Sequence, residues 1–177
     1  MKLRLLAGLA VLFLGACSSF LPQAPRADLG NFALGHNIVV APAPHQGPGS
    51  REVSDEELIT AMKYAMAARF EPYEGEKLYN FGISVDGYSL AGVAVPVLVS
   101  PKSALIINVT VWDDAAGQRL NPEPYQIAVV EDINAQSIIG SGFFNTRDQQ
   151  LAALTAKAAL RVEEWLLENP EWIGLDS

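Results

Sequence analysis

The eight residues YNFGISVD, positions 79–86, set the architecture of the chain. Large apolar side chains at every second position alternate with small or polar ones. Successive side chains of a β-strand point to opposite faces, so this period of two predicts a strand with one buried face. The run LIINVTVW at 105–112 has the same period and predicts a second strand of the same sheet.

Two shorter segments extend this sheet. The run NIVVA, residues 37–41, is apolar and β-branched, which is typical of a strand in the interior of a sheet. The run YQIAVVE, residues 125–131, indicates a further strand. The intervening residues DDAAGQ, 113–118, begin with aspartate and offer Gly117 for a positive φ, which predicts a turn.

Two capping signals predict helices. The residues SDEE, 54–57, match a capping box, in which a serine hydroxyl accepts from the third following N–H and a glutamate reaches back. Apolar residues at helical spacing follow, and Pro72 ends this helix. Thr146 and Gln149 begin a second helix, which ends at Pro170. The apolar face of the second helix comprises Leu151, Leu154, Ala158, Val162, Trp165 and Leu166.

The order of strand, helix, several strands and helix predicts an α+β fold. We expect a mostly antiparallel sheet of about four to five strands with two helices packed on one face. Arg69 is expected to place its charge beside the last carbonyls of the first helix, with its stem on the core. Glu163 and Glu164 are expected on the solvent side of the second helix.

The segment GVAVPVLVS, residues 92–100, is the candidate partner contact. It keeps a strict period of two but contains Pro96, which cannot donate to a strand ladder, so it indicates an edge strand or a hairpin arm. Either its valine face lies under a helix, or it binds a partner by strand addition. The valines concerned are Val93, Val95, Val97 and Val99.

The chain begins as a secretory signal. Lys2 and Arg4 precede an apolar run of twelve residues, 5–16, which suits a signal peptide and is too short for the roughly 20 residues of a spanning helix. The run ends in LGAC, residues 14–17, and Cys17 is the single cysteine of the chain.

The LGAC sequence resembles the lipobox of bacterial lipoproteins. The resemblance implies a diacylglycerol thioether on Cys17, cleavage after Ala16 and acylation of the new amino terminus. Acyl chains would then hold the protein on a membrane without a spanning segment. Serine rather than aspartate at position 18 favours the periplasmic face of the outer membrane over the inner membrane. The alternative is an ordinary signal peptide with a free thiol.

These features predict three regions: a signal peptide at 1–16, a lipidated flexible tether at 17–36, and a single domain at 37–177. The tether reaches about 65 Å when fully extended, unless Phe32 or Leu34 packs on the domain. Cleavage removes Lys2 and Arg4, which changes the net charge from −8 to −10. We therefore expect no nucleic-acid partner.

Residues suited to catalysis or metal binding are few. His36 and His45 lie in stretches rich in proline and glycine, and two histidines do not complete a zinc site. The adjacent acids at 113–114 and 131–132 point to opposite faces of a strand, so neither pair converges on one substrate. We predict no catalytic residues, no metal and no cofactor.

The element order is similar to that of small α/β envelope lipoproteins, namely auxiliary lipoproteins of transport systems and the N-terminal domain of TolB. The matching segments within 37–168 are NIVVAP, SDEELITAMKYAM, FGISVDGYSL, INVTVWDDAAGQRL and LTAKAALRVEEWL. We expect a lipid-anchored, non-catalytic binding or accessory component that faces the periplasm and contacts an envelope protein in a transport or envelope-maintenance system. The alternative is an envelope hydrolase with a carboxylate site.

Overall fold

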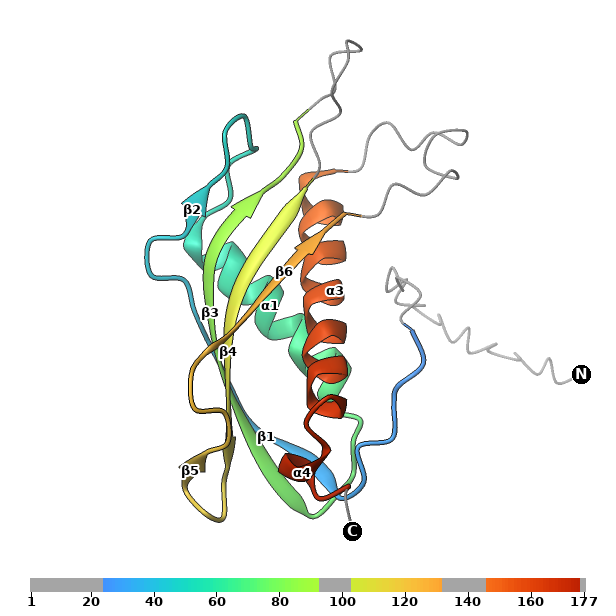
Figure 1. Ribbon diagram of the computed structural model, residues 1–177. Helices are drawn as coiled ribbons and strands as arrows, with labels where there is room; N and C mark the ends of the chain where they lie inside the picture. Colours follow the sequence, from blue (N-terminus) through green and yellow to red (C-terminus); the bar gives the residue numbers. More distant parts are fainter. Residues whose placement is uncertain (1–23, 93–102, 132–145, 176–177) are drawn as a thin grey trace, which may run out of the picture.

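One twisted sheet carries both long helices on the same face (Figure 1). The computed structural model describes residues 24–92, 103–131 and 146–175. Within these residues the strands are β1 (Phe32–Val40), β2 (His45–Gln46), β3 (Lys77–Ser89), β4 (Ala104–Asp113), β5 (Gln118–Arg119) and β6 (Tyr125–Val130). The helices are α1 (Asp55–Phe70), α3 (Arg147–Leu167) and α4 (Pro170–Ile173).

The sheet is mostly antiparallel, and the predicted α+β fold is confirmed. The central strand β4 pairs antiparallel with β3, β5 and β6, whereas β1 and β2 pair with β3 in the parallel direction. Parallel strands need a crossover connection, and α1 supplies it between β1 and β3. The expected interior position of 37–41 is wrong, because β1 lies at the sheet edge and Ile38 is 60% exposed.

Both predicted capping boxes are present. The Ser54 hydroxyl accepts from the N–H of Glu57 at 3.2 Å, and a Glu57 carboxylate oxygen accepts from the N–H of Ser54 at 2.9 Å. Thr146 and Gln149 make the same reciprocal bonds at 3.2 and 2.9 Å. Each box satisfies backbone donors that the first turn of a helix otherwise leaves unpaired.

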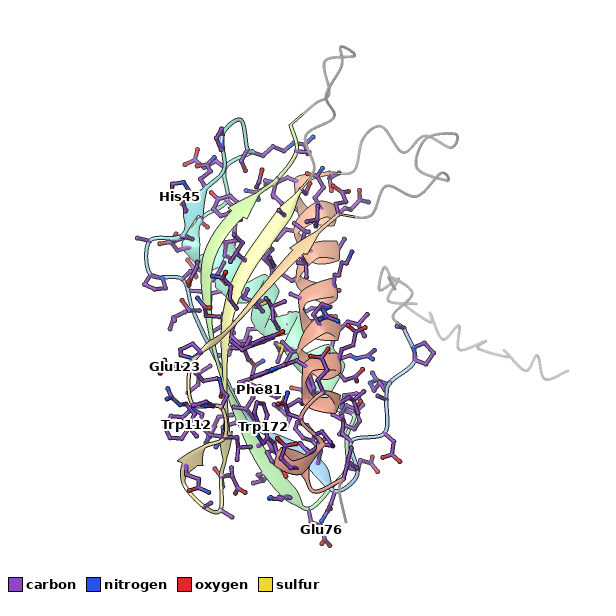
Figure 2. The ribbon with its side chains drawn as sticks, in the orientation of Figure 1. His45, Glu76, Phe81, Trp112, Glu123 and Trp172 are labelled. Atoms are coloured by element: carbon purple, nitrogen blue, oxygen red, sulfur yellow. The ribbon has the colours of Figure 1, made fainter. Side chains whose placement is uncertain are left out.

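The core lies between the sheet and the helices. The alternate positions 79, 81, 83 and 85 of β3 are buried, as the period of two predicted. Phe32 stacks on Tyr79 with ring centroids 5.0 Å apart, and Phe70 of α1 lies 4.9 Å from Phe81. Figure 2 shows Phe81 on the helical side of the sheet and Trp112 on the opposite side.

The turn predicted after β4 is also present. Gly117 has a φ of +62°, and its N–H donates to the carbonyl of Asp113 at 2.9 Å. This φ lies in the left-handed region that glycine adopts without steric cost. The turn therefore returns the chain for the short pairing of β5 with β4.

Residues 24–31 pack on the domain, whereas the sequence predicted a tether through residue 36. We call residues 24–31 the strap. Leu29 in the strap and Phe32 at the start of β1 have no exposed surface. Burial of these two apolar side chains favours the docked arrangement, because each contributes about 1.5–3 kcal/mol. The expected packing of Phe32 is therefore observed, and the part of the predicted tether at 17–23 lies outside the described residues.

Candidate functional site: the strap and the uncovered sheet face

The residues named as sites from the sequence lie outside the described ranges. These are Cys17 and the valines at 93, 95, 97 and 99. The strands on either side of the valine segment, β3 and β4, meet it at the end of the sheet where α3 begins (Figure 1). Lipidation at Cys17 and a partner contact at 93–99 thus stay predictions. Two other features, both formed by described residues, are candidates for a functional role.

The first feature is a clamp that fastens the strap to both long helices. Arg69 of α1 donates from Nη1 to the carbonyl of Ala24 at 2.6 Å and from Nη2 to that of Pro25 at 2.9 Å. Its Nε donates to Glu163 Oε1 of α3 at 2.9 Å, and its Nη2 forms an ion pair with Glu163 Oε2. One guanidinium thus joins α1, α3 and the strap.

Glu163 is buried, and its expected solvent-facing position is wrong. Its side chain is 2% exposed and that of Arg69 is 4% exposed. The hydroxyl of Tyr73 forms a hydrogen bond with Glu163 Oε1. The same hydroxyl oxygen lies 2.8 Å from the carbonyl oxygen of Ala27. Burial, followed by the hydrogen bond to Glu163, raises the pKa of Tyr73 well above its usual range. The phenol therefore stays protonated and able to donate.

The clamp has the chemistry of a structural ion pair. Glu163 receives hydrogen bonds from a guanidinium and a phenol, so its charge is compensated inside the protein. A buried pair of this kind contributes little compared with apolar residues of equal volume, but removal of one member leaves a buried charge and costs about 3–5 kcal/mol. The pair is thus a strong local constraint on where the strap lies.

Further contacts hold the strap along its length. Arg26 donates to the carbonyls of Ala68 and Arg69 at 3.1 and 3.2 Å, so it caps the C-terminal end of α1. Gly30 has a φ of +62°, and a Cβ at this position would lie 2.9 Å from a methyl carbon of Leu175. The strap therefore turns toward β1 at a position that requires glycine for both backbone and space.

The second feature is the sheet face opposite the helices. No element in the described part of the chain covers it (Figure 1). Alternate positions of its strands point away from the core, and several carry large apolar side chains that are 36–60% exposed. These side chains are Ile38, Val40, Leu78, Ile106, Trp112 and Val130. We call this surface the uncovered sheet face.

Polar side chains cross the middle of the uncovered sheet face. Asp86 accepts from the hydroxyl of Ser84 at 2.6 Å and from the amide of Asn108 on the next strand. Asn80 donates to Asp114 at 2.8 Å and accepts from the N–H of His36 at 2.6 Å. These hydrogen bonds fix polar groups between apolar ones, which is the mixed composition found at non-obligate protein interfaces.

A further carboxylate among the described residues, that of Asp113, also stabilises the fold. Asp113 pairs with Lys77 at 3.0 Å, and its pKa is lowered by the N–H of Ala116 first and by Lys77 second. No group of three or more histidine, cysteine, aspartate or glutamate residues within 24–92, 103–131 and 146–175 is placed to hold a metal ion. None of the helices described there is both long and apolar enough to cross a membrane.

An ion pair joins the helices at their N-terminal ends. Arg147 at the start of α3 pairs with the carboxylate of Glu57 and donates to the carbonyl of Glu52 at 3.1 Å. The hydrogen bond from Arg147, followed by those from Ser54, lowers the pKa of Glu57 to about 2. The carboxylate that completes the capping box of α1 therefore also links α1 to α3.

Comparisons with known proteins give distant structural similarities. No family model and no curated protein matches the chain. The chain is similar to a candidate lipoprotein of Caulobacter crescentus, with 13% identity, a TM-score of 0.41, and coverage of 80% of this chain and 92% of that one. A Xanthomonas campestris protein from a family of unknown function has 10% identity, a TM-score of 0.45, and coverage of 80% and 88%.

A minor lipoprotein of Acinetobacter baumannii has 15% identity, a TM-score of 0.30, and coverage of 76% of this chain and 93% of that one. Two of these three similar proteins are thus described as lipoproteins or candidate lipoproteins. All three TM-scores are below 0.5, so the properties of those proteins are not carried over to this chain.

Proposed function

We propose that this protein is a lipid-anchored component of the bacterial cell envelope that binds another protein and performs no catalysis. Acyl chains on Cys17 hold it on the periplasmic face of the outer membrane. The domain acts as a binding or accessory subunit of a transport or envelope-maintenance system. The LGAC sequence at 14–17 supports the anchor.

The uncovered sheet face is the observation that carries the binding role. It presents apolar side chains, with Ile38 60% and Val130 42% exposed, around a fixed polar centre. Its edge strand β1 carries no Lys, Arg, Asp or Glu, although exposed edges are commonly guarded by such residues. An envelope protein that covers this face would bury the apolar groups and leave the acidic remainder of the surface in water.

Metabolic labelling with a tagged fatty acid tests the anchor. The wild-type protein should carry the label and fractionate with the outer membrane. Cys17→Ala should lose the label and accumulate as precursor, whereas Ser18→Ala, a matched change at the next position, should keep the label. A wild-type protein that is freely dissolved with an unmodified thiol would overturn the proposed anchor.

Site-specific photocrosslinking in intact cells tests the partner. A photoreactive residue at 38, 106 or 112 on the uncovered sheet face should capture a defined envelope protein, which mass spectrometry identifies. The same residue at Thr60, on the exposed side of α1, is the control and should capture less. Equal capture from both faces would contradict a binding role for the sheet.

The valine segment needs a separate test. Replacement of Val95 and Val97 by glutamate should leave the thermal unfolding temperature unchanged if this segment is an exposed contact. Loss of crosslinking with retained folding would place the partner there. Unfolding of the double variant would assign these valines to the core and remove them as a contact.

A further inference from the structure

We propose that the strap sets the orientation of the domain on the membrane: the layer of α1 and α3 faces the bilayer, and the uncovered sheet face is turned away from it. This inference rests on the proposed acylation of Cys17. The proposed lipid would then be joined to the domain by the short stretch 17–24, which we call the link, and not by a tether that extends to residue 36. The link meets the domain where Arg69 holds Ala24 and Pro25.

The first argument is where the chain leaves the domain. Ala24 and Pro25 are held by Arg69, and that guanidinium is fixed in turn by Glu163. These two side chains come from α1 and α3, so the point of exit belongs to the helical layer. Figure 1 shows the strap beside α3, on the side of this helix that is away from the sheet.

The second argument is the length of the link. Only the chain from Cys17 to Ala24 separates the proposed lipid from the clamp, which is at most about 24 Å when extended and about 15 Å as a flexible coil. A helix layer and a sheet layer together are roughly 20 Å thick. To turn the sheet toward the bilayer, the link would have to cross almost this whole thickness in a nearly extended form. The loss of chain entropy opposes that arrangement.

The third argument is that adhesion to lipid does not supply the orientation. On α3, Arg161 is paired with Glu164 and lies 3.9 Å from Glu168, so its cation is already neutralised. The whole chain has a net charge of −8. Cleavage would remove Lys2 and Arg4, so the processed chain has a net charge of −10. Anionic headgroups therefore repel the domain, and the link alone determines which side lies near them.

Energy transfer on vesicles tests this orientation. The full-length acylated protein is reconstituted in phosphatidylcholine vesicles that contain a trace of acceptor on the lipid headgroup. A donor is attached to a single introduced cysteine, either Glu168→Cys at the C-cap of α3 or Gln126→Cys on β6; both positions are exposed. Transfer should be higher from position 168 than from position 126, because position 168 lies in the helical layer.

Two variants test the role of the clamp. Insertion of ten glycine and serine residues between Gln23 and Ala24 lengthens the link and leaves the clamp intact. Arg69→Met combined with Glu163→Met removes the hydrogen bonds to the carbonyls of Ala24 and Pro25 and leaves no buried charge. The contacts of Arg26 and Leu29 with the domain remain. The insertion should abolish the difference in transfer between positions 168 and 126, and the double variant, in which the strap is first held at Arg26, should reduce it. Circular dichroism reports whether the fold is retained. The insertion keeps the test decisive if the double variant fails to fold.

The outcomes separate this inference from the proposed function. If the wild-type protein does not float with the vesicles, the acyl anchor and the orientation both fail. If it floats and the two donor positions give equal transfer, or position 126 gives more, the anchor stands and the orientation is wrong. A difference that persists after the ten-residue insertion would also overturn the role of the short link.

Discussion

Arg69 of α1 contacts two parts of the chain that are distant from it in sequence, α3 and the strap. Its guanidinium bonds the carboxylate of Glu163, 94 residues away, and two carbonyls of the strap. Arginine suits this position because its planar group has five donors in a fixed geometry and stays charged at every relevant pH. A lysine has three donors on one nitrogen and could not make the four hydrogen bonds that Arg69 makes from three nitrogens.

Arg69→Met should reduce the free energy of unfolding by about 3–5 kcal/mol, because it leaves the charge of Glu163 buried and unpaired. The double variant Arg69→Met with Glu163→Met should be more stable than this single variant, since no charge is stranded. Urea denaturation at neutral pH measures both values. A double variant that is less stable than Arg69→Met would show that the charge is compensated by groups other than Arg69.

Glu57 makes the stability of the folded protein depend on pH in the acid range. Its pKa is lowered from 4.5 to about 2 in the folded state, with the hydrogen bond from Arg147 as the largest cause. A carboxylate whose pKa is lower in the folded state than in the unfolded state stabilises the fold when the pH is above the unfolded-state pKa. For Glu57 this stabilisation is lost as the pH falls from about 4.5 toward about 2.

Thermal unfolding between pH 6 and pH 3 measures this contribution. Glu57→Gln is the matched variant, because glutamine preserves the capping box and removes only the charge. The wild type should be the more stable protein at pH 6, and the difference should narrow below pH 4.5. A difference that is constant over this range would contradict the role of the Glu57 charge.

Among the strands, β4 has side chains that point alternately to the buried face of the sheet and to the uncovered sheet face. Ile107 has no exposed surface and packs under the helices, whereas its neighbour Ile106 is 36% exposed on the uncovered sheet face. Ile107→Ala should cost about 2–5 kcal/mol because it leaves a cavity, and Ile106→Ala about 1 kcal/mol or less. Chemical denaturation of both variants measures this. Similar costs would show that the second face is covered in solution.

The capping box of α3 can be tested in the same manner. Thr146→Ala removes the hydroxyl that accepts from the N–H of Gln149 and should lower stability by about 1 kcal/mol. Thr146→Ser keeps the acceptor and should remain within a few tenths of a kcal/mol of the wild type. The midpoint of urea unfolding distinguishes the two variants, and equal losses would mean that the methyl group of threonine, not the cap, is important.

Local patterns in the sequence predicted the helices and most of the longer strands. They did not predict contacts between residues that are distant in sequence. The period of two at 79–86 and the caps at Ser54 and Thr146 depend on near neighbours, so they could be recognised directly. The pairing of Arg69 with Glu163 depends on how α1 and α3 pack, which no local period encodes. The proline and glycine content of the strap indicated a tether, although Leu29 inside it is fully buried.

At the scale of the whole molecule, the strap belongs to the folded domain. A soluble form that begins at Ala24 should unfold cooperatively at nearly the temperature of the complete mature domain. A form that begins at Phe32 lacks buried Leu29 and the two strap carbonyls that accept from Arg69, so its unfolding temperature should fall by several degrees or more. Differential scanning calorimetry compares the two. Equal temperatures would show that the strap contributes nothing to stability.

The late position of Glu163 in the sequence has a consequence for biogenesis if the proposed acylation takes place. The strap begins seven residues after the proposed acylation site, yet the carboxylate that completes its clamp lies in the last turns of α3. A chain that is delivered from its amino terminus presents Cys17 long before Glu163 arrives. If Cys17 is acylated as proposed, the lipid would be attached before Glu163 can bind Arg69, and the strap could dock fully only after α3 has been made.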